Sequence, residues 1–195
     1  MSLPDDQRIL EGIVTTVSAA GAVNVAPMGP IVNDDFSTLI FRPFQSAQTY
    51  RNLRGHGQGV FHVVDDVEQL ARAAVGEEVT PPLRAAAQVR GFVLEDCCRY
   101  FEFEVTSLDD REERTRIEAR VVHAGRVREF FGFNRAKHAV VEAAILATRL
   151  HLIPAAEIDV DFARLAVIVD KTGALPERRA FGFLADFVKR KREET

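Results

Sequence analysis

Asn24-Val25-Ala26-Pro27-Met28-Gly29-Pro30 and Ser46-Ala47-Gln48-Thr49-Tyr50-Arg51-Asn52-Leu53 are the two segments that decide the fold. The first is typical of a strand that ends in a turn, because its prolines and glycine oppose further ladder pairing. The second is typical of a short helix that follows a strand ending at Arg42-Pro43. Ser46 can accept from the first-turn amides, so it is the expected N-cap, and Gly55 is the expected end.

The start of this helix is a candidate anion site. A helix start offers unpaired N–H groups and a partial positive charge. Ser46 and Thr49 add hydroxyls, and Arg42 and Arg51 can add full positive charges. We therefore expect one phosphate group to bind there. The alternative is an ordinary strand–helix connection in which Ser46 and Thr49 only cap the helix.

The strands around these segments favour a barrel. Residues 13–18 are rich in β-branched side chains, and with residues 23–26 they predict a hairpin. Further strands are predicted at 37–42 and 59–64. Residues 100–105 and 115–121 alternate apolar and charged side chains, which predicts an antiparallel pair with a solvated outer face. Such spacing, with only short helices between the strands, indicates a closed antiparallel barrel.

Two segments interrupt this pattern. Residues 65–75 have acidic residues at their head, helical apolar spacing and Gly76 at their end, which predicts a short helix that crosses the barrel. Residues 76–89 contain Pro81-Pro82 and are expected to be a surface excursion.

After residue 130 the sequence predicts helices and no further strands. Asn134 is the expected cap of a helix over residues 135–150, and two more helices are predicted over 155–171 and 176–192. The chain is thus expected to contain a barrel domain over residues 1–130 and a helical region over 131–195. The first of these helices carries a stripe of mostly small residues: Ala136, Ala139, Val140, Ala143, Ala144 and Ala147.

The first turn of that helix carries Arg135 and Lys137, where the helix dipole disfavours positive charge. A bound anion would resolve this conflict, and simple exposure to solvent is the alternative. The stripe would be poorly covered in a lone monomer, so we expect symmetric pairing of two chains to bury it. The alternative is that it packs beneath the two last helices of its own chain.

The composition argues against several kinds of partner and site. The chain has 195 residues, a formal net charge of −4 and a pI near 5.8, which argues against nucleic acid as a partner. Its start resembles no secretory signal and no apolar run is long enough for a membrane span, so we expect a cytoplasmic protein. Cys97 and Cys98 are adjacent and are expected to be reduced, with a strained vicinal disulfide as the alternative. No metal-ligand spacing or catalytic constellation is present, so no metal is expected and the catalytic residues are unknown.

Taken together, Asn24-x-Ala26-Pro27, Phe41-Arg42-Pro43, Ser46-x-x-Thr49-x-x-Asn52 and the strand from Gly59 resemble the flavin-reductase-like split barrels, which bind FMN. Residues 11–16 and 134–137 are more closely similar to an archaeal and bacterial branch of unknown function. The resemblance covers roughly residues 9–149.

This resemblance implies an α+β protein: a mainly antiparallel, FMN-binding split β-barrel with a C-terminal helical appendage. It implies FMN as the cofactor. The residues implied or expected to bind it are Asn24, Ala26, Pro27, Met28, Gly29, Phe41, Arg42, Ser46, Thr49, Tyr50, Asn52, Asn134, Arg135 and Lys137. Two departures matter: Ala47-Gln48 replaces a Lys-Asp pair of the better-known reductases, and Val64-Asp65 replaces Val-Asn. The counter-charge of the phosphate must then come from elsewhere, and Arg42 and Arg51 are the candidates, with a residue of a second subunit as the alternative.

The resemblance also implies a function. We expect an FMN-dependent oxidoreductase of flavin-reductase-like type that acts on a small-molecule substrate. The alternative is a non-catalytic protein that binds FMN or a related phosphate-bearing cofactor. Split barrels of this kind form pairs, so we expect a homodimer with the flavin near the subunit interface.

Overall fold

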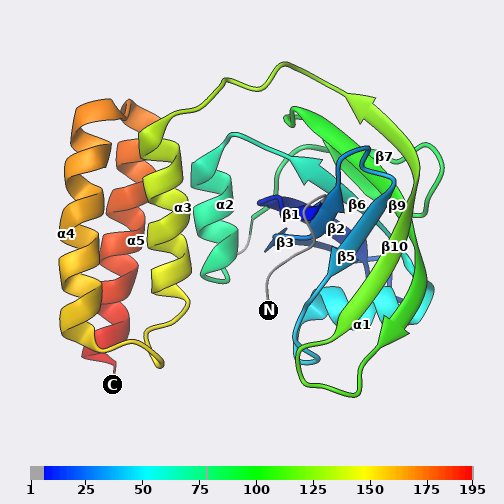
Figure 1. Ribbon diagram of the computed structural model, residues 1–195, viewed down its shortest axis with the longest axis horizontal. Coiled ribbons are helices and arrows are strands. Elements are labelled where there is room, and N and C mark those ends of the chain that lie inside the picture. The colour runs from blue at the N-terminus through cyan, green and yellow to red at the C-terminus, as the bar shows by residue number, and fades with distance from the viewer. Residues whose placement is uncertain (1–6, 78, 195) are drawn as a thin grey trace. The chain divides into compact units, whose positions relative to one another are not determined.

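The computed structural model describes residues 7–77 and 79–194 (Figure 1). The chain divides into two compact units. The barrel unit contains the described residues up to Val64 together with Thr80–Phe130, and the helical unit contains Asp65–Val79 and the chain from Phe131 onward. The helical unit thus includes Asp65–Val79 from the middle of the sequence. The predicted boundary at residue 130 would place this segment in the barrel domain.

The barrel unit is built on one eight-stranded sheet in which every neighbouring pair is antiparallel. Along the sheet the order is β1 (Gln7–Ile9), β4 (Ile31–Asn33), β5 (Thr38–Phe41), β10 (Arg116–Arg126), β9 (Arg99–Asp109), β6 (Gln58–Val63), β2 (Gly12–Val17) and β3 (Val23–Met28). The sheet curls without closing, since β1 and β3 remain edge strands among the described residues (Figure 1). The α+β class and the split barrel are confirmed, whereas a closed barrel was the wrong expectation.

Aromatic rings fill the core of this unit. Phe41, Phe61 and Phe103 are fully buried, and the rings of Phe41 and Phe103 lie 4.8 Å apart. β2 is buried along its whole length, whereas every residue of the edge strand β3 is half-buried. The pairing of β2 with β3 continues through Pro27 to Met28, so the prediction that Pro27 ends the ladder is wrong. Proline is tolerated there because β3 is an edge strand.

The helix α1 (Gln48–His56) begins and ends later than the sequence predicts. Its N-cap is Ala47, so the prediction that Ser46 caps it is wrong. Its end is Gly57 and not Gly55, because Gly57 adopts φ 69° and its N–H bonds the Leu53 carbonyl. A left-handed φ is the conformation that glycine adopts most easily.

The segment expected as a surface excursion is mostly exposed, as predicted, but from Thr80 onward it is also bonded to the barrel. It contains β7 (Leu83–Ala85), which pairs with β8 (Phe92–Leu94). The buried carboxylate of Glu102 accepts from three successive amides, those of Ala87, Gln88 and Val89. The buried His62 accepts from the Leu94 amide at 3.1 Å. These bonds supply donors for the buried Glu102 carboxylate and for His62 Nε2, while His62 Nδ1 bonds the Ile13 carbonyl.

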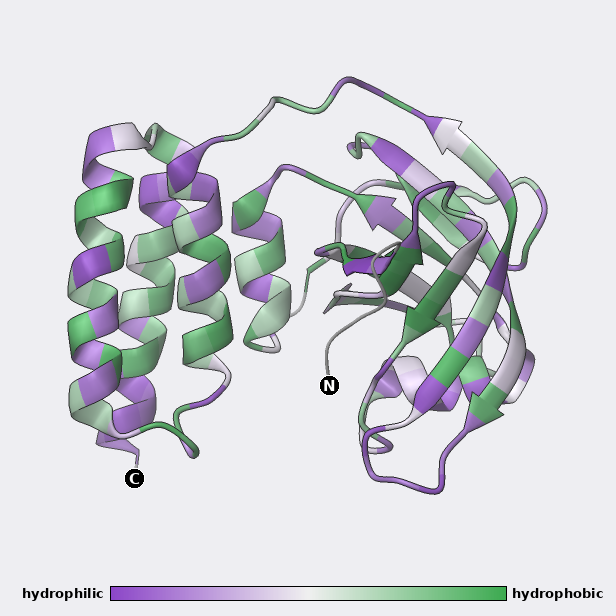
Figure 2. Ribbon diagram, in the orientation of Figure 1, coloured by the Kyte–Doolittle hydropathy of each residue, from purple (hydrophilic) through white to green (hydrophobic). Residues whose placement is uncertain are grey.

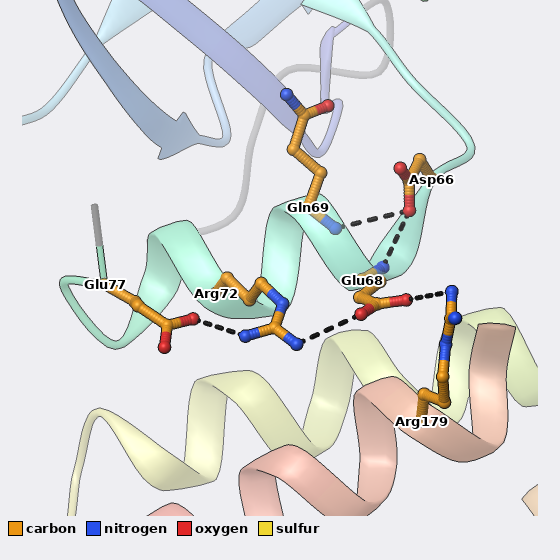
Figure 3. A network of polar contacts seen from close by, with 6 residues as sticks. All are labelled: Asp66, Glu68, Gln69, Arg72, Glu77 and Arg179. Atoms are coloured by element: carbon orange, nitrogen blue, oxygen red, sulfur yellow. Dashed lines mark hydrogen bonds and ion pairs between the residues drawn. The ribbon is translucent and has the colours of Figure 1, made fainter. Parts of the chain in front are cut away.

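The helical unit consists of α2 (Val67–Ala74), α3 (Arg135–Ala147), α4 (Ala155–Thr172) and α5 (Leu175–Glu193). The predicted helix over 65–75 is confirmed as α2, but it belongs to the helical unit, where it packs against α3 and α5. Figure 3 shows its polar contacts: Asp66 caps its start, Arg72 lies between Glu68 and Glu77, and Arg179 of α5 binds Glu68 at 2.8 Å.

The stripe of small residues on α3 lies inside the helical unit. All six of its residues are buried in a core to which α2, α4 and α5 also contribute. The prediction that a second chain buries this stripe is therefore wrong, and the alternative, packing within its own chain, is confirmed.

Candidate functional site

A chain of hydrogen bonds joins the β2–β3 hairpin to the start of α1. We call it the polar junction, and its members are Thr16, Asn24, Gln48, Thr49 and Asn52. Asn24 Nδ2 donates to Thr49 Oγ1 at 3.1 Å, and Asn52 Nδ2 donates to Thr16 Oγ1 at 2.9 Å. Gln48 Nε2 donates to Asn52 Oδ1 at 2.7 Å. The structure thus brings together Asn24, Thr49 and Asn52, which the sequence pattern singled out.

The polar junction positions the helix start. Thr16, Thr49 and Asn52 are buried, and each bonds another member, so their role is to fix α1 against the strand ends. Thr16 and Gln48 were missed by the sequence analysis. Thr16 could have been found, because a hydroxyl in an otherwise apolar strand needs a buried partner.

Arg51 lies at the start of α1 and is held there by three bonds. Its Nε and one Nη donate to Gln48 Oε1 at 3.2 and 2.8 Å, and its other Nη donates to the Ser46 carbonyl at 2.7 Å. A guanidinium has five N–H groups, so one on each Nη has no acceptor among the described residues. The Ser46 side chain is exposed beside it. No described side chain caps the first amides of α1, and the first turn holds no acidic residue.

Arg42 follows β5 directly, and its residue is half-buried. The Nε atom of Arg42 is buried and has no hydrogen-bond partner among the residues that the structure describes. The Arg42 carbonyl accepts from Arg114 Nε at 3.3 Å, which fixes the backbone at this point. A buried N–H of a charged group is costly without an acceptor, so this atom is suited to a ligand that brings one.

Several predicted residues belong to the scaffold around this site. Phe41 is fully buried in the aromatic core. Tyr50 is also buried, and its hydroxyl donates to Asp110 at 2.8 Å. Ala26 and Met28 pack against the barrel core from the half-buried strand β3. Pro27 lies between them in the same strand, and Gly29 follows it where a Cβ atom would lie 2.8 Å from the Glu11 carboxylate.

The residues predicted at the start of α3 lie in the helical unit. Asn134 is confirmed as the cap, because its side chain accepts from the Lys137 amide at 3.1 Å. Lys137 Nζ lies 3.3 Å from the buried carboxylate of Glu177, and Arg135 is exposed. Burial alone would raise the pKa of Glu177, but bonds from the Ala174 amide and Lys137 lower it below its usual value. Glu177 therefore offsets the unfavourable position of Lys137, and the role of Arg135 in ligand binding stays a prediction.

The described part of the chain contains no group of three or more His, Cys, Asp or Glu side chains that could hold a metal ion. None of the helices in that part combines the length and the hydrophobicity of a membrane span.

Two family models match the chain in succession. The one described as "Protein of unknown function (DUF447) N-terminal domain" matches residues 10–128, and the one described as "Protein of unknown function (DUF447)" matches residues 134–186. Comparison with curated proteins gives no match.

Solved structures share the fold. The FMN-bound protein MM1853 from Methanosarcina mazei, matched to DUF447, is 22% identical, with a TM-score of 0.79 over 92% of this chain and 94% of its own. The styrene monooxygenase flavin reductase from Pseudomonas putida S12 is 18% identical, with a TM-score of 0.50 over 62% of this chain and 82% of its own. Flavoredoxin from Methanosarcina acetivorans is 10% identical, with a TM-score of 0.52 over 65% and 74%. At these identities the likeness establishes the fold.

The two family models together cover most of the chain and meet close to the boundary between its last barrel strand and α3. The chain therefore belongs to the DUF447 family, and its barrel unit has the flavin-reductase-like split-barrel fold.

Proposed function

We propose that the barrel unit binds FMN, with the phosphate at the start of α1. The observation that carries this proposal is the helix start itself. No described side chain caps its first amides, and Arg51 is held beside them with two N–H groups that no described residue accepts from. A phosphate suits such a start because its oxygens can accept from several donors at once. The similarity to the FMN-bound protein MM1853 supports the choice of FMN.

Arg42 is a second candidate to bind the same phosphate. Its buried Nε needs an acceptor, and a phosphate oxygen is a strong one for a guanidinium. Ala47 and Gln48 stand where related reductases have a Lys-Asp pair, so Arg42 and Arg51 are the cations proposed to balance the phosphate charge.

FMN fits the proposed site better than FAD. One short helix start provides donors for a single phosphate, and the sequence contains no Gly-x-Gly-x-x-Gly loop for a pyrophosphate. Calorimetric titration of the purified protein with FMN and with FAD tests this. We expect tight binding of FMN alone, and no FMN binding at micromolar protein would overturn the proposal.

We infer further that the protein is an FMN-dependent oxidoreductase for a small-molecule substrate. Bound FMN would supply the redox chemistry. The chain would bind the phosphate through the α1 amides, Arg42 and Arg51, while the polar junction keeps α1 in place. The half-buried strand β3 offers its edge, between Asn24 and Gly29, to the flavin ring.

Turnover and mere binding can be separated by experiment. The FMN-loaded protein is mixed with NADH or NADPH without oxygen, and the visible flavin band is followed. Bleaching supports the oxidoreductase. Full retention of the band with both nucleotides would favour the alternative, a protein that binds FMN without turning it over.

We also propose that the protein is a cytoplasmic homodimer with the flavin near the subunit interface, and that nucleic acid is no partner. The exposed edge and half-buried residues of β3 support pairing of barrels, because a second subunit would cover them. Cys97 and Cys98 are buried and are not joined in a disulfide, which is consistent with a reducing compartment. Light scattering with FMN present tests the dimer, and a monomer at micromolar protein would contradict it.

A further inference from the structure

The helix α4 is apolar on two opposite sides, and only one of them is covered. Ile158 and Val169 are buried, and Phe162 and Leu165 pack beside them against the core of the helical unit. On the other side Ala156, Val160, Ala163 and Val167 are all exposed, Val160 by 61% and Val167 by 49%. We call these four residues the α4 outer face. Figure 2 shows hydrophobic residues along the whole length of α4. An exposed apolar face along a helix is typical of a surface that another protein covers.

The spacing of the α4 outer face is that of a helix-pairing seam. Its residues follow one another at intervals of four, three and four, which is the heptad pattern of the a and d positions in a coiled coil. The buried side of α4 has a different set of residues, so the outer face is not needed for packing within the helical unit. We propose that the α4 outer face binds the same face of a second copy of this chain, with the two helices antiparallel, in a contact separate from the barrel pairing proposed above.

Side-chain size supports the antiparallel direction. A two-fold axis midway between Val160 and Ala163 places Val160 opposite Ala163 of the partner subunit. The same axis places Val167 opposite Ala156 of the partner subunit. Every layer then joins a larger side chain to a smaller one, which lets the two faces interdigitate closely. A parallel pair would set valine against valine and alanine against alanine.

The charged residues that flank the seam also favour antiparallel pairing. In antiparallel coiled coils the e positions of the two helices face each other, and here they include Glu157 and Arg164. The axis defined above brings Arg164 next to Glu157 of the partner subunit, twice by symmetry. Arg164 is available for this, since its side chain is 78% exposed and its ion pair with Asp161 spans 3.5 Å. Glu157 is exposed as well.

The other flank of the seam offers no comparable attraction. Asp159 lies there, and it already binds Arg192 of its own chain at 2.7 Å. A parallel pair would depend on Asp159 as the partner of Arg164, whereas the antiparallel pair depends on Glu157. Leu152, before the start of α4, and Leu175, after its end, are also exposed. Antiparallel pairing brings the end with Leu152 to the end with Leu175 of the partner subunit.

The first test is the mass of the full-length protein by sedimentation at several concentrations. Val167→Glu would place a charge in the seam, and we expect it to weaken self-association by about a hundredfold or more. Phe44→Glu is the matched control, because Phe44 is an apolar barrel residue with the same 49% exposure. It should leave the α4-dependent association unchanged. A monomeric wild-type protein, or equal masses for wild type and Val167→Glu, would overturn the proposal.

A charge exchange tests the register. Glu157→Arg and Arg164→Glu should each weaken association by about tenfold, since each sets like charges together. The double variant Glu157→Arg/Arg164→Glu should restore it, and failure to restore it would contradict the antiparallel register. FMN titration of every variant keeps this inference separate from the proposed function. Changes in α4 should alter the mass and leave FMN affinity unchanged, whereas loss of FMN binding in the wild type would contradict only the proposed function.

Discussion

Replacing Arg42 by methionine should change the stability of the ligand-free protein and its affinity for FMN in opposite directions. Methionine keeps most of the apolar stem and removes the buried Nε, which has no acceptor among the described residues. An unsatisfied buried donor costs about 1–3 kcal/mol, so the ligand-free variant should be as stable as the wild type or more stable by up to that amount. Loss of a hydrogen bond between charged groups should weaken FMN binding by about 1.5–3 kcal/mol, or about 10- to 150-fold.

Two assays measure these effects on the same sample. Chemical denaturation of the ligand-free protein gives the free energy of unfolding, and calorimetry gives the FMN dissociation constant. Arg51→Met is the comparison, because the Arg51 side chain is exposed and already bonded to Gln48 and Ser46. It should weaken FMN with little change in stability. A lower stability of the ligand-free Arg42→Met protein together with unchanged FMN affinity would refute the reasoning.

Three further changes test the scaffold. Thr16→Val removes the acceptor of Asn52 Nδ2, so the free energy of unfolding should fall by about 1–3 kcal/mol; an unchanged denaturation midpoint would contradict a role for the polar junction. Because the folded-state pKa of Glu177 is lowered, its ionised carboxylate stabilises the fold at neutral pH, and this stabilisation is lost as pH falls through the folded-state pKa. Lys137→Met removes one cause of the lowered pKa, so the free energy of unfolding of this variant should depend less on acid pH than that of the wild type. Burial lowers the pKa of His62 to about 4, so stability should decline as pH falls from about 6.5 to 4, and His62→Gln should flatten that part of the curve in pH-dependent denaturation.

Local sequence signals predicted those elements whose ends are determined by local chemistry. The hairpin of β2 and β3 was predicted because β-branched runs flank a short turn, and α3 because Asn134 is a strong cap. The short strands β1, β4, β7 and β8 have three residues each, too few to show a period of two. The end of α1 was predicted at Gly55 and not at Gly57 because either glycine could end the helix. Which of them adopts a positive φ is visible only in the backbone conformation.

The candidate site was predicted in part for the same reason. Spacing identified Asn24, Thr49 and Asn52, but Thr16 joins them only through strand pairing, which the sequence does not display. Periodicity also showed that one side of α3 is apolar without showing what covers it. α2, from the middle of the chain, covers part of it, and no local signal assigns residues 65–79 to the helical unit.

The place of α2 in the sequence has a consequence for how the chain folds during synthesis. α2 leaves the ribosome long before α3 and α5, the helices against which it packs. Until they follow, Val67 and Ala71, which are buried in the finished unit, have no partners there. The core of the helical unit can therefore be completed only after α5 is made, although every strand of the barrel is complete by Arg126. A nascent chain stalled after residue 130 should consequently be cut by protease within residues 65–79 sooner than within β2 or β6.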